Sequence, residues 1–193
     1  MSTTMLDRAF GHPHGLLGRI GGALMAFANG PEEEHVVAVA RLTRTETVLV
    51  VGPGPGVGLA AAASRAGVVI GVDPSEEMLA RCRERAANAL LRNGSAADTG
   101  QEAESVDVVL SVNNVQLWED RAAGFAELYR VLRPGGRIVL STHEKALPVP
   151  RHRLAAEAEA AGFTDLQSWT WEPPRFSGTA AQLRAWRSDA GRS

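Results

Sequence analysis

The sequence predicts a single α/β domain built on a mostly parallel sheet with helices on both faces. Apolar runs alternate with amphipathic helical stretches along the chain, and the runs are β-branched without polar alternation, as in strands buried on both faces. The 193 residues are 45% hydrophobic and 22% charged, which is typical of one globular domain with a sizeable core. We therefore expect residues 46–193 to form the α/β core and residues 1–45 to add an N-terminal helical lid.

The first half of the predicted core contains two strands, each followed by a helix. The strands are Thr47–Val51 (TVLVV) and Gly67–Val72 (GVVIGV), with an Ala-rich helix over residues 58–66 between them. Residues 74–93 (PSEEMLARCRERAANALLRN) predict one helix, because Ser75 is a suitable N-cap, acids follow it and one face is apolar. Asn93 and the glycine after it would end that helix.

The second half begins with a third buried strand over Ser105–Val112 (SVDVVLSV). A helix over residues 121–132 (RAAGFAELYRVL) follows, with one apolar stripe. Arg133–Gly136 (RPGG) predicts a turn, and Arg137–Thr142 (RIVLST) predicts the next strand.

The C-terminal part predicts a helix over residues 153–163, closed by Gly162, and a strand over residues 164–172 (TDLQSWTWE). Residues 178–187 (GTAAQLRAWR) fit two alternatives. Their alternation suits an antiparallel final strand, whereas their Ala, Gln, Leu and Arg content also suits a helix. We predict the strand.

Four glycines, at positions 52, 54, 56 and 58, occur where the first strand turns into the first helix. In doubly wound sheets this turn presents backbone N–H groups and a helix N-terminus to a ligand, and glycine allows close approach or a positive φ. Asp73 lies 21 residues after Gly52, at the end of the next strand, where a carboxylate can bind two ribose hydroxyls. The alternative is a tight turn with a capping Asp.

The spacing of the glycines favours one nucleotide-like cofactor over another. The dinucleotide pattern G-x-G-x-x-G/A fits only from Gly56, which would place its glycines inside the helix. The pattern G-x-G-x-G fits better from Gly52, and that spacing favours S-adenosylmethionine. The glycine loop alone does not decide between cofactors.

Four motifs carry a family resemblance over about residues 47–163: VLVVGPGPG, GVDPSEEML, SVDVVLSVNNVQLW and ELYRVLRPGGRIVLST. In order and spacing they resemble class I S-adenosylmethionine-dependent methyltransferases of the small-molecule group called type 11 or UbiE-like. The resemblance implies a Rossmann-like, doubly wound, seven-stranded sheet of order 3-2-1-4-5, with the last two segments beside strand five. It also implies S-adenosylmethionine as methyl donor and S-adenosylhomocysteine as product.

The resemblance further implies which residues bind the cofactor. The glycine loop would pass beneath the methionine part, Asp73 would bind the ribose, and the residues after it would pack near the adenine. Ser95 and the backbone of Ala96 would meet the adenine edge, and the residues after the fourth strand would line the donor and substrate pocket. The full set is Gly52, Pro53, Gly54, Gly56, Asp73, Pro74, Ser75, Met78, Ser95, Ala96, Asn113, Asn114 and Val115.

Two positions depart from the family pattern. Val50 and Ser95 stand where the family usually has acids, and Glu46 is too distant along the first strand to replace the first of them. Each lost bond to a charged group costs ~1.5–3 kcal/mol, which would lower cofactor affinity about tenfold or more. Two alternatives to methyl transfer therefore remain at this point: a non-methylating relative, such as a cyclase or isomerase, and a non-catalytic binding protein.

A general base is needed only if the methyl acceptor must lose a proton, and histidine suits that role near neutral pH. His143 follows the strand at 137–142 and is the first candidate, although a solvated loop histidine is the alternative. His12 and His14 in the predicted lid, together with Gln116 and Trp118, are candidate substrate contacts. Packing explains Gln116 and Trp118 equally well, and the same applies to Glu144.

Charge and composition exclude several classes. The net charge of −2, without a Lys/Arg cluster on a predicted helix, argues against a nucleic-acid partner, and NNVQ (113–116) is not the pattern that clamps an amino group in nucleic-acid N-methyltransferases. That loop lacks carboxylates for Mg²⁺, so we expect no metal. A single cysteine excludes an intrachain disulfide and argues against thiol-based arsenic methylation.

The location and partners follow from the same features. The apolar stretch at residues 15–30 is interrupted by Arg19 and is shorter than a membrane span, so we expect neither export nor membrane insertion. The expected location is the cytoplasm, the expected partner is a small-molecule substrate, and monomer and homodimer both remain open.

Overall fold

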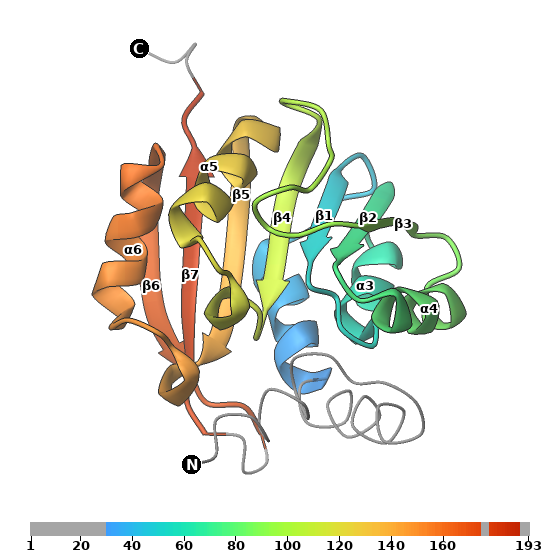
Figure 1. The fold of residues 1–193 in the computed structure, drawn as a ribbon, viewed down its shortest axis with the longest axis horizontal. Coiled ribbons are helices and arrows are strands. Elements are labelled where there is room, and N and C mark those ends of the chain that lie inside the picture. The colour runs from blue at the N-terminus through green and yellow to red at the C-terminus, as the bar shows by residue number, and fades with distance from the viewer. Residues whose placement is uncertain (1–29, 175–177, 190–193) are drawn as a thin grey trace.

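The computed structural model describes residues 30–174 and 178–189, and in these residues one seven-stranded sheet forms the centre (Figure 1). Its order is β3-β2-β1-β4-β5-β7-β6, with β7 antiparallel to both of its neighbours and the other pairs parallel. The predicted order is confirmed, and so is the strand predicted at 178–187. The strands are β1 Thr47–Val51, β2 Val68–Asp73, β3 Leu90–Asn93, β4 Val106–Val112, β5 Leu132–His143, β6 Phe163–Trp171 and β7 Ala180–Arg187.

Helices cover both faces of the sheet. The helical segment 30–40 shares one apolar cluster with α3 (Val57–Ala63) and α4 (Glu76–Arg85). On the other face, α5 (Arg121–Val131) and α6 (Arg151–Ala160) pack on a second cluster. Figure 1 shows α5 in front of the sheet and the segment 30–40, in blue, behind it.

Neighbouring residues of the central strands face opposite clusters, which explains their unbroken apolar runs. In β1, Leu49 faces the α5 and α6 side while Val50 faces the α3 side, and in β4 Val109 and Leu110 divide in the same way. Alternate residues of a strand point to opposite faces, so a strand covered on both sides must be apolar throughout.

The prediction of one helix over residues 74–93 was wrong in its second half. Helix α4 ends at Arg85, where the capping residue Ala86 leaves helical geometry (φ −132°, ψ 67°). Residues Leu90–Asn93 form β3, which pairs with β2 from Ile70↔Leu90 to Asp73↔Asn93. Three of the four residues of this edge strand are exposed, so it lacks the apolar run that identified the buried strands.

The predicted RPGG turn lies inside a strand rather than before it. Strand β5 begins at Leu132, opposite Val106, and the next paired position is Val108↔Arg137. Between these two pairs the chain advances two residues in β4 but five residues in β5. Arg133–Gly136 therefore forms an irregular bulge, in which Gly135 has φ +79°. The strand predicted at 137–142 is the regular part of this longer element.

The segment 30–40 is fixed to the core. Val36, Val37 and Ala40 are no more than 1% exposed. The Arg137 guanidinium donates to the carbonyl of Ala40 at 2.9 and 2.5 Å. The predicted lid at residues 1–45 stays a prediction for its first 29 residues, which lie outside the described part of the chain.

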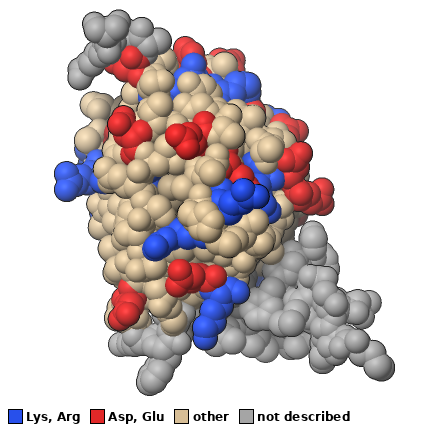
Figure 2. Space-filling view, turned by 90° about the vertical axis from the view of Figure 1, so that its left-hand side faces the viewer, with Lys and Arg blue, Asp and Glu red and all other residues tan. Residues whose placement is uncertain are grey.

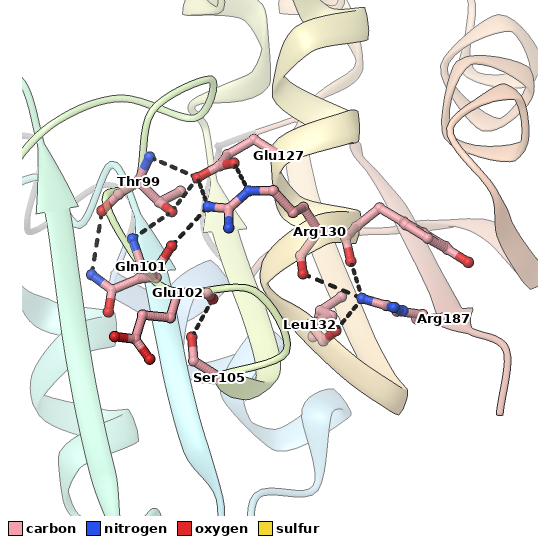
Figure 3. Close-up of polar contacts among 9 residues, drawn as sticks. Thr99, Gln101, Glu102, Ser105, Glu127, Arg130, Leu132 and Arg187 are labelled. Atoms are coloured by element: carbon pink, nitrogen blue, oxygen red, sulfur yellow. Dashed lines mark hydrogen bonds and ion pairs between the residues drawn. The ribbon is translucent and has the colours of Figure 1, made fainter. Parts of the chain in front are cut away.

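Hydrogen bonds from arginine side chains connect the segments between the end of α5 and the start of β4 (Figure 3). Arg130 donates to the carboxylate of Glu127 at 2.6 and 2.9 Å, and Thr99 Oγ1 donates to the same carboxylate at 2.6 Å. Arg187 of β7 donates to the carbonyls of Tyr129 and Leu132 at 3.0 and 2.8 Å. These bonds tie α5, β5, β7 and the loop after β3 together.

The outer face that carries α6 and β6 shows acidic and basic side chains interspersed (Figure 2). No large area of this face is of one charge sign. Within the described residues, no helix combines the length and the apolar character needed to cross a membrane.

Candidate functional site

In the turn between β1 and α3, three glycines spaced two residues apart have a left-handed backbone conformation. The φ angles are +64° at Gly52, +51° at Gly54 and +87° at Gly56, which is the N-cap of α3. Gly52 N–H donates to the carbonyl of Val72 at 2.9 Å, which ties the loop to the end of β2. Side chains are disfavoured at such φ values, so the turn requires glycine.

The loop is open at one glycine and closed at two others. A Cβ at Gly52 would lie 2.1 Å from the Asn114 side-chain nitrogen, and a Cβ at Gly56 would lie 3.2 Å from Cys82 of α4. At Gly54, a Cβ would meet no atom of the described residues within 4 Å. The loop therefore presents bare backbone at Gly54, where a ligand can approach closely, and this geometry fits a nucleotide-like cofactor.

Asp73 lies beside this loop, at the end of β2. Its side chain is 7% exposed, and Oδ1 accepts from the N–H of Ser75 at 2.9 Å. Ser75 in turn caps α4 by accepting from the N–H of Met78 at 3.3 Å. These bonds hold the carboxylate at the carboxyl end of β2, and its ribose-binding role stays a prediction.

The residues predicted near the adenine divide into buried and exposed ones. Met78 and Ala96 are buried, at 4% and 5% exposure, whereas Pro74 and Ser95 are exposed. Ser95 and Asp98 close a short turn through reciprocal backbone bonds of 3.0 and 3.3 Å. The structure brings these residues to the β2 and β3 side of the loop, and their contact with cofactor stays a prediction.

Asn113 follows β4 with a left-handed backbone conformation, and its backbone and side chain make three hydrogen bonds. Its φ is +48°, and its N–H donates to the carbonyl of Ser141 at 2.8 Å. Its side-chain oxygen accepts from the N–H of His143 at 3.0 Å, and its side-chain nitrogen donates to Glu32 Oε2 at 3.0 Å. The ends of β4 and β5 and the segment 30–40 therefore meet at this residue.

The other predicted acceptor-side residues differ in their surroundings. His143 ends β5 with its side chain 30% exposed, and its Nε2 lies 3.9 Å from Glu32 Oε2. Gln116 accepts from the Thr142 hydroxyl at 2.8 Å, while Glu144 is exposed.

Of two further candidates after β4, one packs against the apolar core and the other lies within it. Trp118 donates to Asn114 Oδ1 at 2.6 Å and packs edge-on against Phe125, with ring centroids 5.4 Å apart. Val115 is 2% exposed and belongs to the core. His12 and His14 lie outside the described residues, so their predicted role stays untested.

Sequence reasoning missed two buried acids, Glu32 and Glu33, which are 1% and 8% exposed. Glu33 accepts from the N–H of Gly58, in the first turn of α3. Burial raises the pKa of Glu33 from 4.5 to about 7, against the lowering effect of that bond. The run Glu32-Glu33-Glu34 at the start of a helix gave no signal of this, because acids there are usually solvated.

The position that lacks the family's acid is part of an apolar cluster. Val50 is 6% exposed and lies in the cluster formed with the segment 30–40 and α3. Glu46 ion-pairs with Arg137 at 2.7 Å instead; burial alone would raise the pKa of Glu46, but the bonds from Arg137 outweigh it and the pKa is lowered. In agreement with the sequence analysis, Glu46 does not take the place of an acid at position 50.

No three His, Cys, Asp or Glu side chains come together as a metal site within residues 30–174 and 178–189. Cys82 is buried, its thiol donates to the carbonyl of Gly54 at 3.3 Å, and burial raises its pKa to about 12. A thiol held in this way is a poor nucleophile and a poor metal ligand.

Comparison with known proteins adds a family to this geometry. Residues 49–140 match the family model described as a methyltransferase domain. The chain is 39% identical over 89 residues to an arsenite methyltransferase of Halobacterium salinarum, which covers 44% of this chain and 23% of that protein. It is 31% identical over 105 residues to an uncharacterized methyltransferase of Bacillus subtilis, covering 50% of this chain and 58% of that one. The chain thus spans less than two thirds of these curated relatives.

A solved structure supports the same fold. The phosphoethanolamine N-methyltransferase 2 of Haemonchus contortus, in complex with S-adenosyl-L-methionine, superposes with a TM-score of 0.74 at 18% identity. The match covers 88% of this chain and 57% of that chain. At this identity the likeness concerns the fold alone.

Proposed function

Because residues 49–140 form a domain of the class I S-adenosylmethionine-dependent methyltransferase family, we propose that this chain transfers a methyl group to a small-molecule acceptor. The acceptor atom would be an O, N or C nucleophile. One observation carries the proposal: the open glycine loop, Asp73, Asn113 and His143 all lie at the carboxyl ends of β1, β2, β4 and β5. Ligands of open α/β sheets bind at that edge.

The residues divide into a binding group and a transfer group. The backbone at Gly54 would approach the methionine part of the cofactor, Asp73 would bind the ribose hydroxyls, and Met78 and Ala96 would pack near the adenine. S-adenosylmethionine supplies an activated methyl group, so the chain's own task is to align the acceptor and exclude water. Asn113 and Asn114, which follow β4, would line that pocket, whereas Val115 is 2% exposed and belongs to the core.

His143 is the proposed general base. Its partly exposed ring lies at the carboxyl end of β5, with Nε2 3.9 Å from Glu32 Oε2. A neutral His143 would take the proton from an acceptor hydroxyl or ammonium group. The methyl group would then bond to the freed lone pair and leave S-adenosylhomocysteine.

A small molecule is favoured over nucleic acid by the interspersed charges on the α6 and β6 face and by the net charge of −2 (Figure 2). Thiol-dependent methylation of arsenic is disfavoured, because the chain's single cysteine, Cys82 of α4, is buried and its thiol donates to the carbonyl of Gly54. We therefore do not propose arsenite as the acceptor, although the Halobacterium relative is called an arsenite methyltransferase.

The test incubates the protein with methyl-labelled S-adenosylmethionine and separated small-molecule, protein and nucleic-acid fractions of a cell extract. Label in the small-molecule fraction is the expected result, and label only in a macromolecular fraction would contradict it. His143→Gln should lower transfer about a hundredfold or more, since a general base contributes ~10²–10⁴-fold. The exposed His152, at the start of α6, gives the matched control His152→Gln, which should transfer normally.

A further inference from the structure

We propose that Glu32 is a positioning residue of the transfer site, which acts through Asn113 to hold His143 and the end of β4 in place. The inference rests on the proposed function, because it concerns the order of that same site. Glu32 precedes the region that matches the methyltransferase domain, so it is a feature of this chain outside the matched residues.

Glu32 reaches the site from a segment that is distant in sequence. It lies in the first turn of the helical segment 30–40 and is 1% exposed. Its Oε1 accepts from the Ser141 hydroxyl of β5 at 2.6 Å, and its Oε2 accepts from the Asn113 side-chain nitrogen at 3.0 Å. One carboxylate therefore joins the helical segment to the ends of two neighbouring strands.

Asn113 passes this constraint on to His143. Asn113 has a left-handed backbone with φ +48°, a conformation that asparagine tolerates better than most residues other than glycine. The Asn113 side chain has two ends: its nitrogen bonds to Glu32, and its oxygen accepts from the backbone N–H of His143 at 3.0 Å. The bond to Glu32 thereby fixes the orientation of the Asn113 side-chain amide. Only in that orientation does the amide oxygen accept from the backbone N–H of His143.

A second set of contacts keeps Glu32 itself in place. Gln182 of β7 donates to the Ser141 hydroxyl at 3.1 Å, and its oxygen lies 3.3 Å from His35 Nε2. The His35 ring stacks on Trp171 with centroids 4.0 Å apart and an interplanar angle of 3°. Because His35 lies one turn after Glu32 on the same segment, these contacts fix the carboxylate from two sides.

The first experiment measures order and binding together. Backbone and side-chain amide signals of ¹⁵N-labelled protein report the His143 N–H and the Asn113 NH₂, and calorimetry gives the Kd for S-adenosylhomocysteine. Glu32→Ala should move both sets of signals and raise the Kd roughly tenfold, as expected for a buried donor left without its charged acceptor. Glu32→Gln keeps an oxygen for Asn113 and should stay within about threefold of wild type.

Glu34→Ala is the matched control, because Glu34 is exposed on the same helical turn. It should change neither the amide signals nor the Kd. A folded Glu32→Ala protein with unchanged signals and unchanged Kd would overturn the proposal.

A double-mutant cycle distinguishes positioning from general support of the fold. Asn113→Gly accepts the left-handed backbone but removes the amide that connects Glu32 to His143. If Glu32 acts through Asn113, then Glu32→Ala in the Asn113→Gly background should cause less than about a twofold further loss. Equal losses in both backgrounds would show independent action and refute the proposal.

Failure to fold is also informative. If Glu32→Ala does not fold, Glu32→Met keeps the side-chain volume and takes its place in the cycle; failure of both would assign Glu32 a structural role and overturn the proposal. A wild-type protein that does not bind S-adenosylhomocysteine would contradict the proposed function instead. The amide signals of the variants would then still decide whether Glu32 holds Asn113 and His143.

Discussion

The acids at the two ends of the sheet find their bonding partners in different ways. At the amino end, acids pair with arginines: Glu46 with Arg137 at 2.7 Å and Asp107 with Arg133 at 2.7 Å. At the carboxyl end, Glu32 bonds to amide and hydroxyl donors, and Glu33 bonds to a backbone N–H. Among the described residues, the basic side chain within 4.0 Å of the Glu32 carboxylate is that of His143, whose Nε2 lies 3.9 Å from Oε2.

This difference separates an end that stabilises the fold from an end that holds the candidate site. Arginine pairing offsets part of the cost of burying a carboxylate, whereas neutral donors leave the charge uncompensated. The pKa of Glu33 is accordingly raised by burial, while the pKa of Glu127, near the arginine-rich end, is lowered because bonds from Arg130 and Thr99 outweigh its burial (Figure 3). Uncompensated acids of this kind concentrate at functional sites.

The largest expected effect comes from removing an acid at the carboxyl end. Asp73→Ala should weaken S-adenosylhomocysteine binding by ~3 kcal/mol or somewhat more, roughly a hundredfold, because two charge-assisted bonds to the ribose would be lost. Calorimetry on the purified variant measures this. Asp107→Ala at the amino end is the control and should leave the Kd unchanged. An unchanged Kd for Asp73→Ala would end the ribose assignment.

The second effect is a pH dependence of stability with opposite sign at the two ends. Glu33 has a pKa of about 7 in the folded protein and 4.5 as its ordinary value, so only the folded state holds this proton between those pH values. Its contribution to the free energy of unfolding is therefore largest below pH 4.5 and falls by about 3 kcal/mol as pH rises to 7. Glu33→Gln should remove that fall in urea denaturation at pH 5 to 8.

The comparison variant for this measurement is Glu127→Gln. The folded pKa of Glu127 is lowered, so its stabilising contribution is present above its ordinary pKa and is lost on acidification. The difference in stability between wild type and Glu127→Gln should shrink as pH falls from 5 to 3. The same direction of change for both glutamates would contradict the distinction between the two ends.

A third effect concerns stability alone. Arg137 is 16% exposed, pairs with Glu46 and donates to the carbonyl of Ala40. Arg137→Ala should lower the free energy of unfolding by ~2 kcal/mol, because Glu46 and that carbonyl would lose their donors. The Kd for S-adenosylhomocysteine should change less than about threefold. The exposed Arg83, whose pair with Glu76 spans 3.8 Å, provides the control Arg83→Ala, with a loss of ~0.5 kcal/mol or less.

The sequence predicted the buried strands and one edge strand, β6, but it missed the other edge strand, β3. Burial on both faces imposes an apolar run on β1, β2 and β4, whereas β3 has a neighbour on one side and exposes most of its side chains. Its residues also continue the apolar pattern of the helix before them. The prediction of a strand at β7 was correct only because the alternating pattern of residues 178–187 slightly favoured a strand over a helix.

The site was predictable where its residues are close in sequence to a strand end. The glycine loop, Asp73, Asn113 and His143 each follow directly from a strand, so topology alone gathers them. Glu32 is different, because it meets Asn113 across 81 positions and Ser141 across 109. Such contacts depend on how the segment 30–40 packs on the sheet, and no local pattern encodes that packing.

The smallest expected effect comes from a substitution that adds an acid at a position where the family usually has one. Ser95 is exposed, so Ser95→Asp has room for a carboxylate that accepts from the adenine amine, and it should tighten S-adenosylmethionine binding up to about tenfold, or ~1.5 kcal/mol. Val50 offers no such room, since it is buried among apolar side chains and Val50→Asp would cost stability. Calorimetry on Ser95→Asp, with Ser95→Asn as the uncharged control, measures the gain. A well-folded Ser95→Asp protein that binds no more tightly than Ser95→Asn would mean that the adenine lies elsewhere.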